Sequence, residues 1–324
     1  MPQHISFAPQ ELDDQPLVYF PSGRPAARIG LTMSFYFSHP DNTERRRTLV
    51  HCIKQYLQQA EGLLRIYAVK KDRTYRKIKL GENPDPALLD EMIDPPAVLE
   101  FLASGAEREG VSHSWSISAY SDNDDRPGAL GCLWLTYPLG ILQTDEAPPR
   151  IFTGQFVSLC NALQVEHAYG GLGLILPFDV GGMRAALQVV GGVAMRFPGL
   201  DVDDLTGVMI QCKQGIKSVN FLTAVSNHLL VKVGGADAVV AQAGEGIEMH
   251  RYSNGAVFQA GPVPQLGDSE QGLVPDRYVA LGRVLRPLRA PYPDVLMYDP
   301  TIADPESDGH DAFTQRWLAR FDGD

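Results

Sequence analysis

The chain has 324 residues, a formal net charge of −11 and a sequence pI of about 5.2. Its content of 44% apolar and 21% charged residues is typical of a packed globular protein rather than a disordered one. Because phosphate recognition needs a basic face, this charge disfavours a nucleic-acid-binding protein and suits a basic protein partner. Many soluble proteins are equally acidic without a specific partner, so the charge alone does not define a function.

The cysteines and the N-terminus exclude several further classes. Cys52, Cys132, Cys160 and Cys212 lie too far apart for a zinc knuckle or a redox-active pair. The N-terminal stretch lacks the basic and then apolar pattern of a secretory signal. No apolar run reaches the roughly 20 residues that cross a bilayer. We therefore expect a cytoplasmic protein with no membrane contact.

Alternation with period two predicts half-buried strands in the first half of the chain. Residues 31–38 alternate apolar side chains with Thr, Ser and Tyr, and residues 111–119 alternate them with serines. Two short strands are predicted at 64–69 and 75–80, and residues 130–137, apolar on both faces, predict a central strand. We expect the polar faces of 31–38 and 111–120 to be open to water or to a partner, because buried hydroxyls need hydrogen-bond partners.

Helical spacing alternates with these strands. Asp41 and Glu44 have capping-box spacing ahead of an apolar stripe that ends at Gly62. The C-terminal aromatic residues Phe313, Trp317 and Phe321 predict a short helix that packs on the body. Further helices are predicted over 86–103, 150–163, 180–196 and through 221–233, with a strand over 171–176.

These elements predict an α+β fold with a mainly antiparallel sheet and packed helices. Asn254-Gly255 predicts a hairpin turn between strands at 247–252 and 256–259. The chain is expected to form one compact unit over 1–324. The similar patterns at 31–38 and 111–120 leave open an arrangement of two similar lobes, 1–145 and 146–324.

Motifs of catalysis and cofactor binding fail on spacing. The sequence contains neither a GxSxG elbow nor an HExxH pair. The pair Gly171 and Gly173 lacks the third glycine of a dinucleotide fingerprint, because Leu176 takes that place. The run Gly215-Ile-Lys217-Ser218 lacks the spacing of a phosphate loop and predicts local packing. We expect no catalytic residues and no cofactor.

Metal ligation is not predicted either. The acidic turns that begin at Asp122 and Asp201 place Arg126 and Leu205 at the third ligand position of a calcium loop, where neither can bind a cation. Asp201, Asp203 and Asp204 are expected in a solvated loop. We expect His113 to be a hydrogen-bonded core histidine and the chain to hold no metal.

Three segments carry a family resemblance: 196–201 (RFPGLD), 215–222 (GIKSVNFL) and 259–268 (QAGPVPQLGD). On these segments the chain resembles the type VI secretion system immunity family, formerly a domain of unknown function. Residues 171–289 carry this resemblance best. It implies a non-enzymatic protein that binds and neutralises a toxic effector of the restriction-endonuclease-like nuclease class. No catalytic residue follows from it.

The sequence thus predicts an immunity protein whose partner is a cognate, basic toxin that acts in the cytoplasm. The acidic turn of Asp122, Asp124 and Asp125 follows a polar-faced strand and is the predicted partner-binding site, with an ordinary solvated turn as the alternative. The competing function is a hydrolase or nuclease-like enzyme with a site dispersed in sequence, which a pocket of convergent polar groups would favour. A structural adaptor of the secretion apparatus is a third option.

Overall fold

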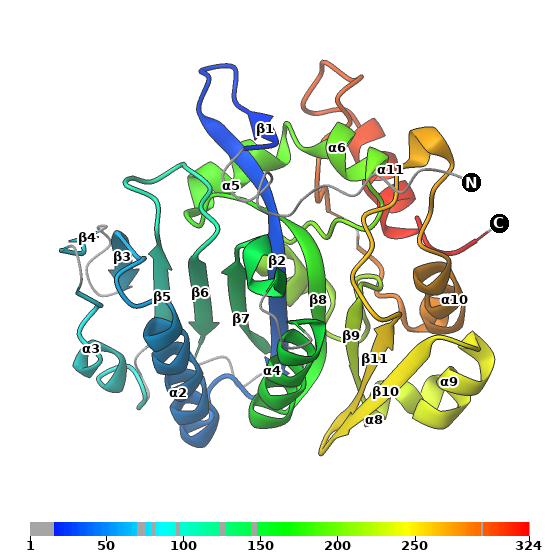
Figure 1. The fold of residues 1–324 in the computed structure, drawn as a ribbon, viewed down its shortest axis with the longest axis horizontal. Helices are drawn as coiled ribbons and strands as arrows, with labels where there is room; N and C mark the ends of the chain where they lie inside the picture. The colour runs from blue at the N-terminus through cyan, green and yellow to red at the C-terminus, as the bar shows by residue number, and fades with distance from the viewer. Residues whose placement is uncertain are drawn as a thin grey trace.

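A computed structural model describes residues 16–69, 76–79, 82–94, 98–122, 128–143, 148–292 and 294–323. Its described residues form an 11-stranded sheet in the order β10-β11-β9-β8-β2-β7-β6-β5-β3-β4, with β1 paired to β2 (Figure 1). Every pairing between these strands is antiparallel, so the predicted α+β class is confirmed. The strands are β1 (Val18–Tyr19), β2 (Pro25–Ser38), β3 (Ile66–Val69), β4 (Arg76–Lys77), β5 (Leu99–Ser104), β6 (Ser116–Ser121), β7 (Leu130–Tyr137), β8 (Val165–Ile175), β9 (Leu222–Ser226), β10 (Ile247–Tyr252) and β11 (Gly255–Ala260).

Helices cover both faces of this sheet. The α-helices are α2 (Thr43–Gln59), α3 (Ala87–Asp90), α4 (Pro148–Leu163), α5 (Val180–Leu187), α6 (Gly191–Arg196), α7 (Leu205–Gln211), α8 (Asn227–Leu230), α9 (Ala236–Ala243), α10 (Asp276–Leu285) and α11 (Gly309–Leu318). Short 3₁₀ helices lie at Leu139–Gln143, Val231–Val233, Ser269–Gln271 and Arg286–Leu288. The C-terminal helix is confirmed, and its Phe313 and Trp317 are buried together with Phe321.

The sheet is built around β2, which lies between β7 and β8. β2 pairs with β8 from Arg28 to Phe37 and with β7 from Leu31 to Ser38. The sheet is therefore continuous across the boundary suggested at residue 145. The division into two similar lobes stays a prediction.

The helices α2 and α4 cover the face of the sheet that is nearest the viewer in Figure 1. From α2, the buried Tyr56 hydroxyl shares its one proton between the carbonyl oxygens of Ser116 and Thr136, at 3.0 and 2.8 Å. From α4, the Phe156 ring lies 5.1 Å from that of Phe35 on β2. These contacts fix both helices on the apolar side chains of the central strands.

The opposite, polar face of the sheet is also covered, which corrects the expectation that it is open. Ser34 and Thr32 on β2 are 2% and 6% exposed, and Ser116 and Ser118 on β6 are 1% and 5% exposed. Burying a hydroxyl costs little free energy where it forms a hydrogen bond within the protein. Ser116 Oγ, for example, donates to the His113 carbonyl and contacts Ser104 Oγ at 2.9 Å.

Several predicted elements differ in the structure. The strand expected over 111–119 begins only at Ser116, where β6 starts. The helix expected over 86–103 is reduced to α3 and followed by β5, because Pro95 and Pro96 cannot continue a helix. The helix expected through 221–233 begins instead with β9, a fully buried strand. A short run that is buried on both faces shows no alternation, so its sequence cannot distinguish a strand from a helix. The helix expected over 180–196 is divided into α5 and α6. At the start of α2 the N-cap is Asn42 rather than Asp41.

A buried ion cluster joins the segment 201–217 to the polar face of the sheet. The Lys217 ammonium lies 2.9 Å from Asp201 Oδ1 and 3.3 Å from Asp203 Oδ1, and its side chain is fully buried. The Tyr36 hydroxyl of β2 donates to Asp203 at 2.8 Å, and the Tyr169 hydroxyl of β8 accepts from the Lys217 backbone N–H. The expectation of a solvated acidic loop at 201–204 is therefore wrong for the first two aspartates.

Electrostatics keep this lysine charged. Burial alone would lower the pKa of Lys217, but the charges of Asp201 and Asp203 outweigh burial and raise the pKa above its ordinary value. Asp201 also continues the sheet locally, since its backbone N–H donates to Leu172 and its carbonyl accepts from Leu174. The cluster thus ties β2, β8 and the segment 201–217 into one body.

Replacing Lys217 with Met should lower the free energy of unfolding by about 3–5 kcal/mol, because two buried carboxylates would lose their counter-charge. The exposed Lys232, replaced in the same way, should change it by less than ~0.5 kcal/mol. Urea denaturation at pH 7 measures both values. Equal, small losses in the two variants would show that the cluster does not hold the fold.

His167 should make the fold sensitive to acid. Its ring stacks on Tyr36 at 4.8 Å, Nε2 contacts the Cys212 carbonyl at 3.1 Å, and burial lowers the pKa of this fully buried histidine to about 3. The unfolded chain takes up this proton near pH ~6.5 and the folded chain does not, so stability falls by about 1.4 kcal/mol per pH unit below that value.

We expect the His167→Gln variant to flatten the dependence of the unfolding free energy on pH between about 6.5 and 4. His51→Gln, at an exposed position of α2, is the matched control and should keep the original slope. Denaturant titrations at a series of pH values give both slopes. The same slope in both variants would refute the role assigned to His167.

Candidate functional site

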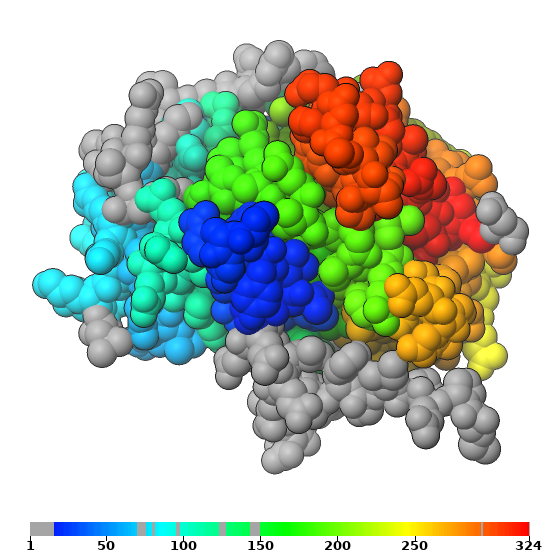
Figure 2. Space-filling model, turned by 90° about the horizontal axis from the view of Figure 1, so that it is seen from above, coloured from blue at the N-terminus to red at the C-terminus, as the bar shows by residue number. Residues whose placement is uncertain are grey.

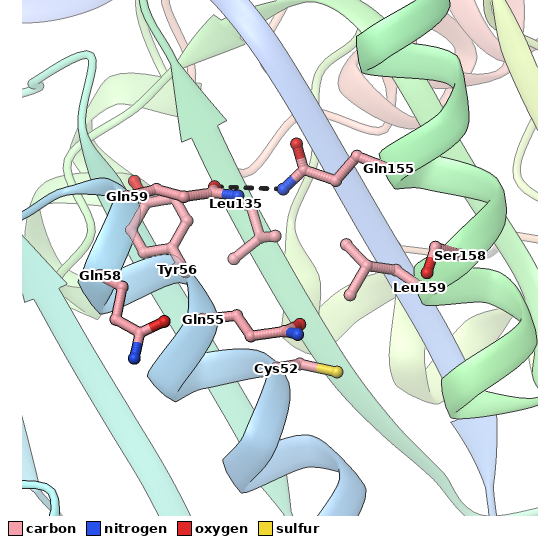
Figure 3. A pocket seen from close by; sticks show the side chains of 9 residues that line it. All are labelled: Cys52, Gln55, Tyr56, Gln58, Gln59, Leu135, Gln155, Ser158 and Leu159. Carbon is pink, nitrogen blue, oxygen red and sulfur yellow. Dashed lines mark hydrogen bonds between the residues drawn. The ribbon is translucent and has the colours of Figure 1, made fainter.

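A groove of about 450 Å³ lies between α2 and α4 and is the first candidate for a binding site (Figure 3). Its floor includes Leu135 of the central strand β7. Its walls present the side chains of the two helices, and the lining consists of Cys52, Gln55, Tyr56, Gln58, Gln59, Leu135, Gln155, Ser158 and Leu159.

Amide side chains dominate the groove. Gln55, Gln58 and Gln59 are spaced at i, i+3 and i+4, so they share one face of α2. From α4, Gln155 Nε2 donates to the Tyr137 hydroxyl at 2.8 Å and to Gln59 Oε1 at 3.2 Å, the contact that is dashed in Figure 3. The two helices are thus joined across one end of the groove, while Gln55 and Gln58 are exposed to solvent.

This lining suits binding better than catalysis. Amides donate and accept hydrogen bonds but do not transfer protons near neutral pH. The two titratable groups of the groove are equally unreactive, since burial raises the pKa of the Cys52 thiol to about 12 and that of Tyr56 well above its ordinary value. Neither of these two groups is therefore suited to act as a general base or a nucleophile.

The helical layer around the groove departs from the acidic average of the chain. Together α2 and α4 carry five basic residues and a single acidic one, Glu44. An electrostatic attraction for a basic partner must therefore come from another part of the surface.

Asp122 of the predicted acidic turn lies directly after β6 and is anchored there. Its carboxylate accepts from the Tyr120 hydroxyl at 2.7 Å, and its carbonyl accepts from the guanidinium of the buried Arg46 at 2.8 Å. Arg46 also donates to the Pro40 carbonyl at 2.9 Å, so it joins the turn to the loop before α2. Asp124 and Asp125 lie outside the described residues, and their part in partner binding stays a prediction.

Further carboxylates lie beside Asp122. Burial lowers the pKa of Arg46, and the charges of Asp122, Asp41 and Asp94 raise it in opposition. These three acidic residues therefore act on the same buried guanidinium, and Asp94 is exposed. The end of the sheet at which β6 terminates is consequently acidic, in contrast to the layer of α2 and α4.

Asp201, Asp203 and Lys217 bring together the carboxylates and the lysine that a nuclease core needs, but in a form that does not suit catalysis. All three side chains are at most 6% exposed, and none of them lines the groove. The ammonium itself fills the space between the carboxylates. Among the residues that the structure describes, no group of three or more His, Cys, Asp or Glu side chains could hold a metal ion.

Sequence reasoning identified neither the groove nor the ion cluster. The spacing of Gln55, Gln58 and Gln59 was a readable signal for a polar helix face, but nothing in the sequence placed α4 beside it. The pairing of Lys217 with Asp201 depends on the tertiary fold alone.

Comparisons with known proteins define the class of this chain. A family model described as type VI immunity for VRR-NUC, with the short name TsiV, matches residues 48–321, so the chain belongs to this immunity family. Among solved structures, the Pseudomonas aeruginosa T6SS protein PA0821 is similar, with a TM-score of 0.78 and 21% identity over 96% of this chain and 92% of that one. At this identity the likeness concerns the fold. Among curated proteins, none matches.

One structural observation bears on membranes. In the part of the chain that the structure describes, every helix is too short or too polar to span a bilayer.

Proposed function

We propose that this chain neutralises a nuclease effector of the VRR-NUC class by binding it directly. The observation that carries the proposal is the match to an immunity family over residues 48–321. The groove between α2 and α4 is consistent with it, because its amide lining supports binding and not catalysis. In this proposal the chain is not an enzyme, and it requires neither nucleic acid nor a membrane to act.

Charge supports a basic partner. A nuclease needs a positive surface to hold the phosphates of its substrate, and this chain carries a net charge of −11. Opposite fields steer the two proteins together and favour the correct orientation. Since the substrate of a DNA-cleaving toxin lies in the cytoplasm, the chain would act there.

We place the charged part of the interface at the acidic end of the sheet, on Asp122, Asp124 and Asp125. Asp41 and Asp94 add negative charge next to Asp122. The buried Arg46 holds the Asp122 carbonyl, so the Asp122 carboxylate would be presented with little loss of conformational freedom. The amide groove would supply uncharged contacts to the same partner.

The enzyme alternative has weaker support. An enzyme would be favoured over a binding protein by a pocket in which polar groups with perturbed pKa values converge. The strongly perturbed carboxylate Asp201 lies in the buried cluster, and the groove holds no carboxylate. The perturbed groups that do line the groove, Cys52 and Tyr56, are held in their protonated forms by burial and are poor bases and nucleophiles.

The complex with a VRR-NUC effector encoded beside this chain should form in a one-to-one ratio and associate more slowly as salt rises. Stopped-flow fluorescence at about 50 mM and 500 mM NaCl should show the association rate constant falling roughly tenfold, because ions screen charges beyond ~10 Å at 0.1 M. Failure to form a complex would refute the proposal. A rate that does not respond to salt would refute electrostatic steering.

Replacing Asp122, Asp124 and Asp125 with Ser should weaken binding of the effector at low salt by about tenfold or more, since charges at an interface act on both rate and affinity. The matched control replaces Asp304, Glu306 and Asp308, three exposed acidic residues ahead of α11, with Ser. Both variants change the net charge equally. Calorimetric affinities that agree between the two variants would place the interface elsewhere.

A further inference from the structure

A second pocket, of about 510 Å³, lies at the end of the sheet opposite the acidic turn. Four segments meet there: the start of β2, the residues before β3, the loop after β5 and the residues before β6. In Figure 2 the start of β2, in blue, lies beside the blue-green loop that follows β5. The polar residues of the lining are Arg28, Arg65, Glu107, Arg108, Ser112 and His113.

The charge of this pocket is opposite to that of the chain. Three arginines line it against one carboxylate, Glu107, which is exposed. Among the described residues, no carboxylate forms an ion pair with Arg65 or Arg108. Arg65 and Arg108, which pair with no described carboxylate, therefore lie at one concave place on an acidic protein.

Backbone carbonyls orient two of these arginines. Arg28 Nε donates to the Ser112 carbonyl at 3.0 Å. Arg65 Nη1 donates to the carbonyls of Gly62 and Leu64, at 2.7 and 3.0 Å. A guanidinium has five N–H donors in a fixed plane, so holding one edge in this way directs the remaining donors.

Ser112 provides a buried donor that lacks a partner. Its side chain is 0% exposed, and its hydroxyl makes no hydrogen bond with the described residues. Buried hydroxyls are almost always paired, so an unpaired one in a pocket wall calls for an explanation. Ser112 is among the lining residues, so the pocket wall contains one hydroxyl whose hydrogen-bonding capacity is unused.

His113 is half-buried in the same wall, which corrects the expectation of a core histidine. Its Nδ1 accepts from the Trp115 backbone N–H at 3.1 Å, so the proton of the neutral ring lies on Nε2. Gly105 makes room for this ring, because a Cβ at position 105 would lie 2.2 Å from His113 Cε1. The imidazole is therefore held at a fixed position in the pocket wall.

The loop that carries these residues is held at several points. Gly105 N–H donates to the Trp115 carbonyl at 2.9 Å, and Ala106 N–H donates to Ser104 Oγ at 3.1 Å. Further along, Gly110 N–H donates to the carboxylate of Asp179, the N-cap of α5, at 2.6 Å. The pocket wall is thus formed before any ligand arrives.

We propose that this pocket is a binding site for a small anion that presents phosphate or carboxylate oxygens. Guanidinium groups match both kinds of oxygen, and the unpaired Ser112 hydroxyl lies in the same wall. The volume lies within the range of about 300–1,000 Å³ that small-molecule sites occupy. The site is separate from the acidic turn and goes beyond toxin binding, because the two lie at opposite ends of β6.

Isothermal titration of the full chain with inorganic phosphate and with citrate, at constant ionic strength set by NaCl, tests the proposal. We expect saturable one-to-one binding of at least one of the two anions. Arg65→Gln and Arg108→Gln should each weaken it by about tenfold, the effect of losing one charge-assisted contact. Arg47→Gln, at an exposed position of α2, removes the same charge elsewhere and should leave binding unchanged.

Binding of phosphate alone would identify a phosphoryl ligand, and binding of citrate alone a carboxylate ligand. Arg108 is exposed, so its replacement keeps the test valid even if Arg65→Gln, which loses two backbone contacts, does not fold. No binding of either anion would overturn the proposal. So would binding that Arg108→Gln and Arg47→Gln weaken equally.

Discussion

The buried contact of Lys217 with Asp201 and Asp203 is the interaction on which the rest of the structure depends. Its partners Tyr36 and Tyr169 lie on the central strands β2 and β8, and the segment that carries it covers the polar face of the sheet. Burying any one of these three charges alone would cost much free energy. Together they cost less, because the lysine and the two carboxylates attract one another. The cluster fixes the segment 201–217 against β2 and β8, on a face whose Ser and Thr side chains are buried instead of exposed.

This way of closing the sheet separates stability from function. Lys217, Asp201 and Asp203 are used inside, where they hold layers together. The acidic end of β6, the amide groove between α2 and α4, and the arginine-lined pocket each present a different chemistry. An immunity protein needs this kind of rigid, unreactive surface, since inhibition by binding requires complementarity and no turnover.

Much of the fold was predictable from local pattern, and the rest was not for identifiable reasons. The strand over 31–38, the central strand β7 and the hairpin at Asn254-Gly255 follow from alternation, continuous apolarity and turn chemistry. The burial of Ser34 and Ser118 did not follow, because it depends on a segment far along the chain. Of the predicted site, Asp122 has a defined place in the structure. Lys217 resembled part of a phosphate-loop motif in the sequence, but it lies at the centre of the buried ion cluster.

The most direct test of the account is a titration of nuclease activity. A purified VRR-NUC effector cleaving linear DNA is mixed with increasing amounts of this chain, and the initial cleavage rate is measured. The account predicts that cleavage falls in proportion to added chain and stops at one equivalent, with the chain alone leaving the DNA intact. Cleavage that persists in the presence of a large excess of the chain would contradict it.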